Sequence, residues 1–295
     1  MQIIDFRCRP PFDTMAKDWI FSLDDKPGNP GLRAKYQKMG MELPASLLGR
    51  SMEEFLKECD AAHIGKTVVP LRRLPTQNND HLGALLRAYP GRFIGFAGVQ
   101  PLEEGIAGAL AQIVLHVVGG PCRGVYMEPG LDPHPWAVDD VGIFPIYEFC
   151  QQHDIPVCLL YGGVFHQKKP PSYDLYEPRR IERVARRFPD LRILLSHACW
   201  PFTALACAVA LNWENVWLSP DGFMIDHPGS QDYVVAANYR LQDKIIFGSL
   251  YPSMPMEFAV SRYKELLRPE VWDRVFNENA SRYLREPAEQ PATPG

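Results

Sequence analysis

Two arginines stand at the end of the first apolar run of the sequence, residues 2–9. Arg7 and Arg9 are two positions apart, so on a β-strand their side chains point to the same side, and two prolines end the strand directly after them. Two neighbouring guanidinium groups repel each other unless an anion lies between them. The pair therefore predicts a site for a carboxylate or phosphate, which guanidinium groups bind through paired hydrogen bonds. The alternative is a surface turn that carries two solvated arginines.

One histidine, His197, stands directly after another apolar run, residues 191–196. An imidazole takes up or releases a proton near neutral pH, so His197 is the candidate general acid or base. Its alternative is a purely structural role. Cys8 lies between the two arginines, but strand alternation directs its side chain to the opposite face, which argues against a nucleophilic cysteine.

Eight short apolar runs alternate with helical stretches along the chain, which is typical of parallel strands covered by helices. The predicted strands are residues 2–9, 66–71, 93–99, 123–127, 155–160, 191–196, 216–219 and 244–249. The predicted helices cover about residues 51–63, 80–89, 102–118, 143–153, 177–188, 201–211, 232–239, 256–267 and 269–283. Eight such units predict an α/β fold, the (β/α)8 TIM barrel, in which functional side chains lie at the carboxyl ends of the strands.

The barrel is expected to form a single domain over residues 1–285, followed by a flexible tail at 286–295. Residues 12–48 form a long insertion after the first strand and show no regular period. A connection of this length in an α/β chain favours a lid or binding loop, with Trp19, Phe21 and Tyr36 as its apolar anchors. A disordered insert is the alternative.

Composition argues against several classes of protein. The formal charge is −4 and no basic patch or polybasic tail is visible, so we expect neither nucleic-acid nor membrane-surface binding. The longest apolar stretches are shorter than a membrane span, and the sequence starts directly with a strand, so no signal peptide is expected. Seven cysteines without a C-x-x-C pair indicate buried free thiols in a cytoplasmic protein. The expected partner is a small anionic substrate.

Four segments near the predicted strand ends carry a family resemblance. They are residues 139–157, LSHACWP at 195–201, IFGSLYP at 246–252 and NENA at 277–280. In this order the segments resemble the amidohydrolase-related family, the branch of metal-dependent barrel hydrolases that includes aminocarboxymuconate semialdehyde decarboxylase. The resemblance implies the TIM barrel, a chemistry of hydrolysis, decarboxylation or hydration, and a homodimer or higher homo-oligomer.

The same segments show where the chain departs from the family pattern. The family places His-x-His at the end of strand one, where residues 7–9 are Arg-Cys-Arg. Leu160 stands where the family has a histidine after strand five, and Leu250 stands where it has an aspartate after strand eight. Only His197 remains, and a divalent metal needs three or four ligands. We therefore expect no metal and no other cofactor.

The expected function is a metal-independent hydrolase for a small carboxylate-bearing or acyl substrate such as an ester, lactone, amide or thioester. Its predicted catalytic residues are Arg7 and Arg9, which hold an anion or oxyanion, and His197. The predicted substrate-binding residues are Arg72, Arg73, Tyr126, Glu128, Tyr161, His166, Trp200, Asp221 and Tyr251. Two alternatives are a carbon–carbon lyase, decarboxylase or hydratase of the same family, and an inactive barrel that binds an anionic metabolite.

Overall fold

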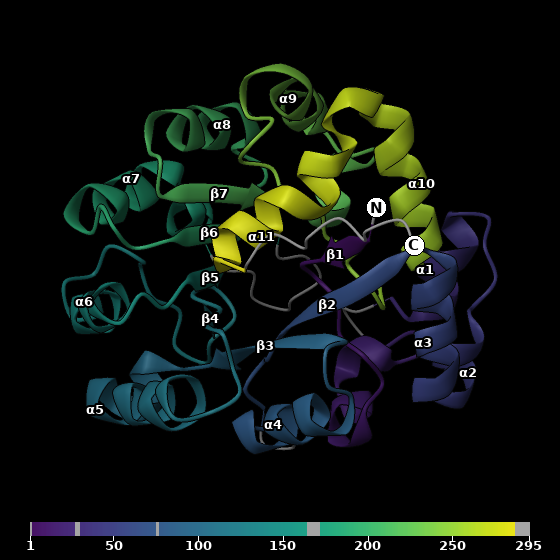
Figure 1. The fold of residues 1–295 in the computed structure, drawn as a ribbon, viewed down its shortest axis with the longest axis horizontal. Coiled ribbons are helices and arrows are strands. Elements are labelled where there is room, and N and C mark those ends of the chain that lie inside the picture. The colour runs from purple at the N-terminus through teal and green to yellow at the C-terminus, as the bar shows by residue number, and fades with distance from the viewer. Residues whose placement is uncertain (1, 27–29, 75–76, 164–171, 287–295) are drawn as a thin grey trace, which may run out of the picture.

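The computed structural model describes residues 2–26, 30–74, 77–163 and 172–286, and its centre is a ring of parallel strands surrounded by helices (Figure 1). The strands lie side by side in sequence order. They are β1 Ile3–Asp5, β2 Ile64–Pro70, β3 Phe93–Gly98, β4 Gly124–Met127, β5 Val157–Leu160, β6 Ile193–Ser196 and β7 Val216–Ser219. The helices outside the ring are α3 Met52–Ala61, α4 Asn79–Ala88, α5 Pro101–Ile113, α6 Phe144–Gln152, α7 Pro178–Arg187, α8 Thr203–Asn212, α9 Ser230–Val235 and α10 Met256–Leu266. The predicted TIM barrel is confirmed.

The eighth predicted strand, residues 244–249, closes the ring without forming a regular strand. The N–H of Ile246 donates to the carbonyl of Leu218 in β7 at 2.9 Å, and the N–H of Phe6 donates to the carbonyl of Phe247 at 2.9 Å. The N–H of Ser249 then bonds to the side chain of Asp5 at 2.8 Å instead of to a backbone carbonyl. The predicted position of this strand is therefore correct, but the segment does not form a regular β-strand. The Asp5 carboxylate accepts one of the hydrogen bonds that a neighbouring strand would otherwise accept.

Aromatic side chains fill the amino-terminal half of the barrel. Phe6 packs edge-on against Phe96 and Tyr283, with ring centroids 5.6 Å and 5.4 Å apart, and Trp217 lies 5.4 Å from Tyr283. Tyr283 belongs to α11 (Asn279–Leu284), which lies across the ring in Figure 1. The packed aromatic rings leave the carboxyl end of the strands as the place for a cavity.

The insertion after β1 folds onto the barrel as short helices. They are η1 Asp13–Lys17, η2 Trp19–Phe21, α1 Leu32–Lys38 and α2 Ala45–Gly49. Phe21 and Tyr36 are buried as expected, and the Tyr36 hydroxyl donates to the carbonyl of Pro252 at 3.1 Å. Trp19 is 43% exposed, so it is less of an apolar anchor than the sequence suggested. Whether the insertion opens and closes as a lid stays a prediction.

One helix of the described part of the chain has the length and composition of a membrane span. It is Pro101–Val118, in which α5 continues into the π-helical turn η3 Val114–Val118. In this structure α5 packs against α6, and η3 packs against α4. It thus occupies the place of a barrel helix.

Removal of the Asp5 carboxylate should weaken the closure of the barrel. Asp5 is fully buried, and its Oδ1 accepts N–H bonds from Arg7 at 3.0 Å and from Ser249 at 2.8 Å. Asp5→Ala leaves both donors unsatisfied, so the free energy of unfolding should fall by about 2–4 kcal/mol. Asp5→Asn keeps an acceptor oxygen and should lose less than half as much. Urea denaturation measures both variants, and equal losses would contradict the role of this oxygen.

Candidate active site

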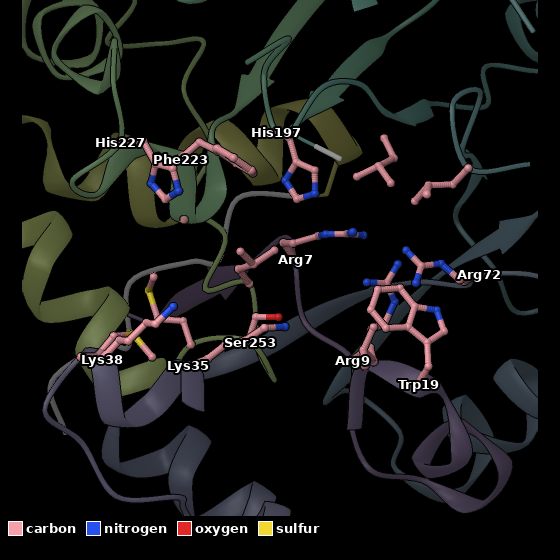
Figure 2. Close-up of a pocket in the computed structure, with 18 residues that line it drawn as sticks. Arg7, Arg9, Trp19, Lys35, Lys38, Arg72, His197, Phe223, His227 and Ser253 are labelled. Atoms are coloured by element: carbon pink, nitrogen blue, oxygen red, sulfur yellow. The ribbon is translucent and has the colours of Figure 1, made fainter. Parts of the chain in front are cut away.

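A cavity of about 420 Å³ opens at the carboxyl end of the barrel strands (Figure 2). Its lining combines basic and apolar side chains. The basic residues are Arg7, Arg9, Lys35, Lys38 and Arg72, with His197 and His227. The apolar residues are Trp19, Ile20, Met39, Leu131, Leu160, Phe223, Leu250 and Met254, and Gly163, Gly222 and Ser253 complete the wall. Within the described part of the chain no aspartate or glutamate lines this cavity, so its chemistry suits an anion with an apolar body.

Three arginines of the cavity share one buried carboxylate, that of Glu128 after β4. Arg72 binds it with two hydrogen bonds, from Nε to Oε2 at 2.7 Å and from Nη2 to Oε1 at 3.0 Å. Arg9 Nη2 lies 3.3 Å from Oε1. Arg7 Nη1 donates to the hydroxyl of Tyr126 at 2.8 Å, and that hydroxyl donates to Oε1 of Glu128 at 2.7 Å. We call these five residues the arginine cluster.

The arginine cluster keeps a net positive charge. Burial by itself would raise the pKa of Glu128, but attraction to Arg72, Arg9 and Arg7 outweighs burial and lowers it to about 2. Burial, followed by repulsion from Arg7 and Arg72, lowers the pKa of Arg9 to about 10, so it remains charged at neutral pH. Within the cluster one carboxylate therefore faces three guanidinium groups, and Asp221 near Arg7 and Asp18 near Arg72 offset part of the positive charge from outside it. Arg7 Nε, Arg9 Nε and Arg72 Nη1 are buried without a hydrogen-bond partner among the described residues.

His197 follows β6 and lies across the cavity from Arg9 and Arg72 (Figure 2). Its Nδ1 lies 3.0 Å from Oδ2 of Asp221, although this approach does not meet hydrogen-bond geometry. The Asp221 carboxylate already accepts bonds from the Ser196 hydroxyl at 2.7 Å, the Ser219 hydroxyl at 2.5 Å and the N–H of His197 at 3.1 Å. These bonds hold Asp221 in place beside the imidazole.

The imidazole of His197 is neutral at physiological pH. Burial is the main cause that lowers its pKa to about 4; Asp221 opposes this shift, and the positive charges of Arg7 and Arg9 add to it. A neutral imidazole is a base with a free nitrogen lone pair.

Strained backbone directs His197 into the cavity. His197, Ala198 and Cys199 have consecutive positive φ angles of 68°, 46° and 65°, and Asp221 has a φ of 54°. Residues other than glycine rarely adopt positive φ angles, and such backbone strain is concentrated at functional sites. The turn after β6 is therefore shaped for the position of His197 at some cost in stability.

Several residues predicted from the sequence lie outside the cavity. Arg73 turns to Glu104, with Nη1 2.6 Å from the carboxylate. The hydroxyl of Tyr161 donates to the carbonyl of Glu177 at 3.2 Å, and the hydroxyl of Tyr251 shares a 2.8 Å bond with Ser46. None of these three predicted substrate-binding residues lines the cavity, because each side chain is bonded elsewhere.

Other predicted residues support the cavity from behind. Tyr126 and Glu128 belong to the arginine cluster and Asp221 contacts His197, but none of the three forms part of the cavity wall. Trp200 donates its indole N–H to the carbonyl of Pro228 at 2.8 Å and packs against Phe223. His166 lies outside the described residues.

The sequence analysis missed the residues that the insertion contributes to the cavity. These are Trp19, Ile20, Lys35, Lys38 and Met39. Trp19 packs over Arg72, with the guanidinium carbon 5.2 Å from the ring centroid. The length of the insertion indicated a binding loop and Trp19 was expected as an apolar anchor, but the insertion has no regular period that would identify the other side chains. Phe223 could have been predicted, because it lies two positions after the predicted site residue Asp221.

The residues of this site do not fit the metal that the family resemblance implies. Leu160 and Leu250 line the cavity at two positions where the family has ligands. Burial raises the pKa of the Cys8 thiol well above its usual value, and Cys8 packs in the core outside the barrel ring. In the described ranges no group of three histidine, cysteine or acidic side chains could hold a metal ion. We therefore derive no chemical step through a metal.

The comparisons with known proteins agree with this geometry. The family described as Amidohydrolase matches residues 4–285. Among solved structures, the chain is similar to an uncharacterised TIM-barrel protein from Bordetella bronchiseptica, with 29% identity and a TM-score of 0.84 over 97% of this chain and 99% of that one. No curated protein matches the sequence.

Two solved decarboxylases are also similar in structure. The chain shares 15% identity with 5-carboxyvanillate decarboxylase from Sphingomonas paucimobilis, with a TM-score of 0.65 over 96% of this chain and 99% of that one. It shares 15% identity with 2,6-dihydroxybenzoate decarboxylase from Rhizobium, with a TM-score of 0.68 over 97% and 99% of the two chains. At this identity the likeness shows a shared fold.

Loss of the Glu128 charge should destabilise the protein strongly. In Glu128→Gln the buried guanidinium groups of Arg9 and Arg72 lose their counter-ion, so the free energy of unfolding should fall by about 3–5 kcal/mol. Glu53→Gln, which removes an exposed partner of Lys57, is the matched control and should leave the free energy of unfolding unchanged within experimental error.

The pH dependence of stability gives the same variant a second readout. The pKa of Glu128 is about 2 in the folded protein and 4.5 ordinarily, so its contribution is complete above pH 4.5 and is lost as the pH falls towards 2. Urea denaturation across this range should show a larger loss in the wild type than in Glu128→Gln, in which only other carboxylates such as Asp139 and Asp221 still titrate. Equal stability of the two proteins at pH 7 would contradict the role of the arginine cluster.

Proposed function

The chain belongs to the amidohydrolase family, and from this premise we propose that it is an enzyme that breaks a carbon–carbon bond in a small carboxylate-bearing substrate with an apolar body. The observation that carries the proposal is the arginine cluster. Its three arginines line the cavity together with Lys35 and Lys38, and among the described residues no acidic side chain forms part of this wall. An anionic substrate balances these positive charges and accepts hydrogen bonds from the guanidinium groups that face the cavity.

The arginines also suit the electron flow of such a reaction. When a carbon–carbon bond breaks, the electron pair left on carbon must be delocalised onto an oxygen atom. Guanidinium donors of Arg7 and Arg9, positioned before the reaction, stabilise the negative charge that develops on this oxygen. This electrostatic role is one that a Lewis-acidic metal performs in related barrels.

Neutral His197 provides the proton transfer. In a substrate with a phenol or enol hydroxyl on the carbon next to the one that bears the carboxylate, the imidazole takes the hydroxyl proton and returns it to the carboxylate-bearing carbon, which makes a β-keto acid. That acid loses carbon dioxide and leaves an enolate or phenolate beside Arg7 and Arg9. Because the bound anion offsets the arginine charges that lower the pKa of His197, the imidazole can hold the proton between the two transfers.

The similar structures support lyase chemistry over the hydrolase that the sequence analysis placed first. Two of the solved proteins are decarboxylases by name, acting on 5-carboxyvanillate and 2,6-dihydroxybenzoate. Both names denote aromatic acids, which match a cavity that combines guanidinium groups with the rings of Trp19 and Phe223. The proposed substrates of this chain are aromatic or unsaturated carboxylates.

Hydrolysis is the second candidate, and one observation favours it. A neutral imidazole with a pKa of about 4 can activate water at any pH above 5, and the arginines can hold the resulting oxyanion. Product analysis separates the two reactions. A lyase releases carbon dioxide or a carbon fragment, whereas a hydrolase incorporates labelled oxygen from solvent water into its product.

Substitutions in the cavity should abolish turnover without unfolding the protein. With a substrate found by screening aromatic and unsaturated carboxylates, lactones and acyl thioesters, His197→Ala should lower kcat/KM by about 10²–10⁴-fold. Arg7→Gln should lower it by about 10²–10³-fold, because one stabilising donor is lost. Arg73→Gln, whose side chain points away from the cavity, is the matched control and should keep activity within about threefold. Unchanged turnover in His197→Ala would show that the imidazole takes no part in the reaction.

The pH dependence of kcat/KM should report the unusual state of His197. Because the reaction starts from the neutral imidazole, kcat/KM should reach half its maximum near pH 4 and stay constant between about pH 5.5 and 8. Steady-state rates in a series of buffers measure this profile. A fall of kcat/KM through pH 6 to 7, as for an ordinary histidine that acts as an acid, would be inconsistent with the proposed role.

A further inference from the structure

Two lysines of the insertion line the cavity without a counter-ion. Lys35 and Lys38 lie one turn apart on α1 and both belong to the cavity wall. Among the described residues neither ammonium group has an ion-pair or hydrogen-bond partner. By contrast, Arg33 on the same helix lies 3.3 Å from the carboxylate of Asp24.

The two lysines face the cavity from a different side than the arginine cluster. In Figure 2 they lie beside Ser253, away from Arg72 and Trp19, and Arg7 lies between the two groups. Apolar side chains such as Met39 and Leu250 contribute to the wall of the same cavity. The cavity therefore has two cationic regions, and apolar side chains form part of the same wall.

The position of the lysines on α1 does not by itself account for this arrangement. Both stand in the last turn of the helix, where positive charges interact favourably with the helix dipole. An exposed orientation would serve that purpose equally well. Lys38 is exposed at the rim of the cavity, but Lys35 is partly buried, and burial lowers its pKa, which means that its charged state is disfavoured in the absence of an anion.

We propose that Lys35 and Lys38 form a second anion subsite, so that the substrate carries two acidic groups joined by a short apolar body. One acidic group contacts the arginine cluster and the other contacts the lysines. This inference rests on the proposed function for the first of the two contacts. It makes the insertion after β1 the segment that selects diacids over monoacids.

Matched mono- and diacids test the second subsite directly. The probes are benzoate, isophthalate and terephthalate, which share one ring and differ in the number and separation of their carboxylates. Isothermal titration calorimetry at low ionic strength gives their affinities for the wild type, for Lys35→Gln and Lys38→Gln singly and together, and for Arg33→Gln. Arg33→Gln is the control, because it removes one positive charge from the same helix outside the cavity.

The subsite predicts a defined pattern of affinities. At least one diacid should bind the wild type roughly tenfold more tightly than benzoate, because a second carboxylate gains charge-assisted hydrogen bonds. This advantage should fall below about twofold in the double lysine variant and persist in Arg33→Gln. Benzoate should bind all of these proteins equally. The single variants, which change half-buried or exposed side chains, give intermediate values if the double variant folds poorly.

Two different failures can be distinguished. If every diacid binds the wild type no more tightly than benzoate, or keeps its advantage in the lysine variants, the second subsite is wrong. If benzoate affinity is unchanged in Arg7→Gln, the first contact and with it the proposed function fail, whatever the lysine variants show.

Discussion

One buried carboxylate shared among three guanidinium groups is the interaction on which the site depends. Glu128 holds Arg72 and Arg9 by direct bonds and Arg7 through the hydroxyl of Tyr126. Without this anion the arginines at the ends of β1 and β2 would repel one another in a poorly solvated place. With it the three side chains are ordered, yet the positive charge is only partly compensated. The arginine cluster is therefore stable without a ligand, and its remaining positive charge attracts an anion.

The barrel confines this positive charge to one end of the strands. The aromatic core and α11 fill the amino-terminal half, so the charge acts only at the carboxyl end of the strands. There the field of the arginines reaches His197 and helps to keep its imidazole neutral. Under the proposed function, binding of an anionic substrate weakens that field, so that the imidazole accepts a proton more readily when a substrate is present. Binding and proton transfer are thus linked through one electrostatic interaction.

The features that local rules determine were predictable from the sequence. Strand alternation placed Arg7 and Arg9 on one side, and the alternation of strands and helices predicted the barrel. The helix predicted from residue 51 is α3, where the Ser51 side chain accepts a bond from the N–H of Glu54. Features that depend on tertiary partners were not predictable. Arg73 differs from Arg72 only in its neighbours, and Tyr161 and Tyr251 bond their hydroxyls outside the cavity. The lysines of α1 lacked any signal, since an irregular segment gives no orientation before it packs.

A crystal structure of the protein grown with manganese and 4-bromobenzoate tests the central claim most directly, because bromine and manganese each give an anomalous signal. The account predicts a carboxylate within hydrogen-bond distance of the guanidinium groups of Arg7 and Arg9, a bromine peak in the apolar part of the cavity, and no manganese peak beside His197. A manganese ion bound to His197, with the carboxylate coordinated to it and the arginines turned away, would contradict the replacement of the metal by guanidinium groups.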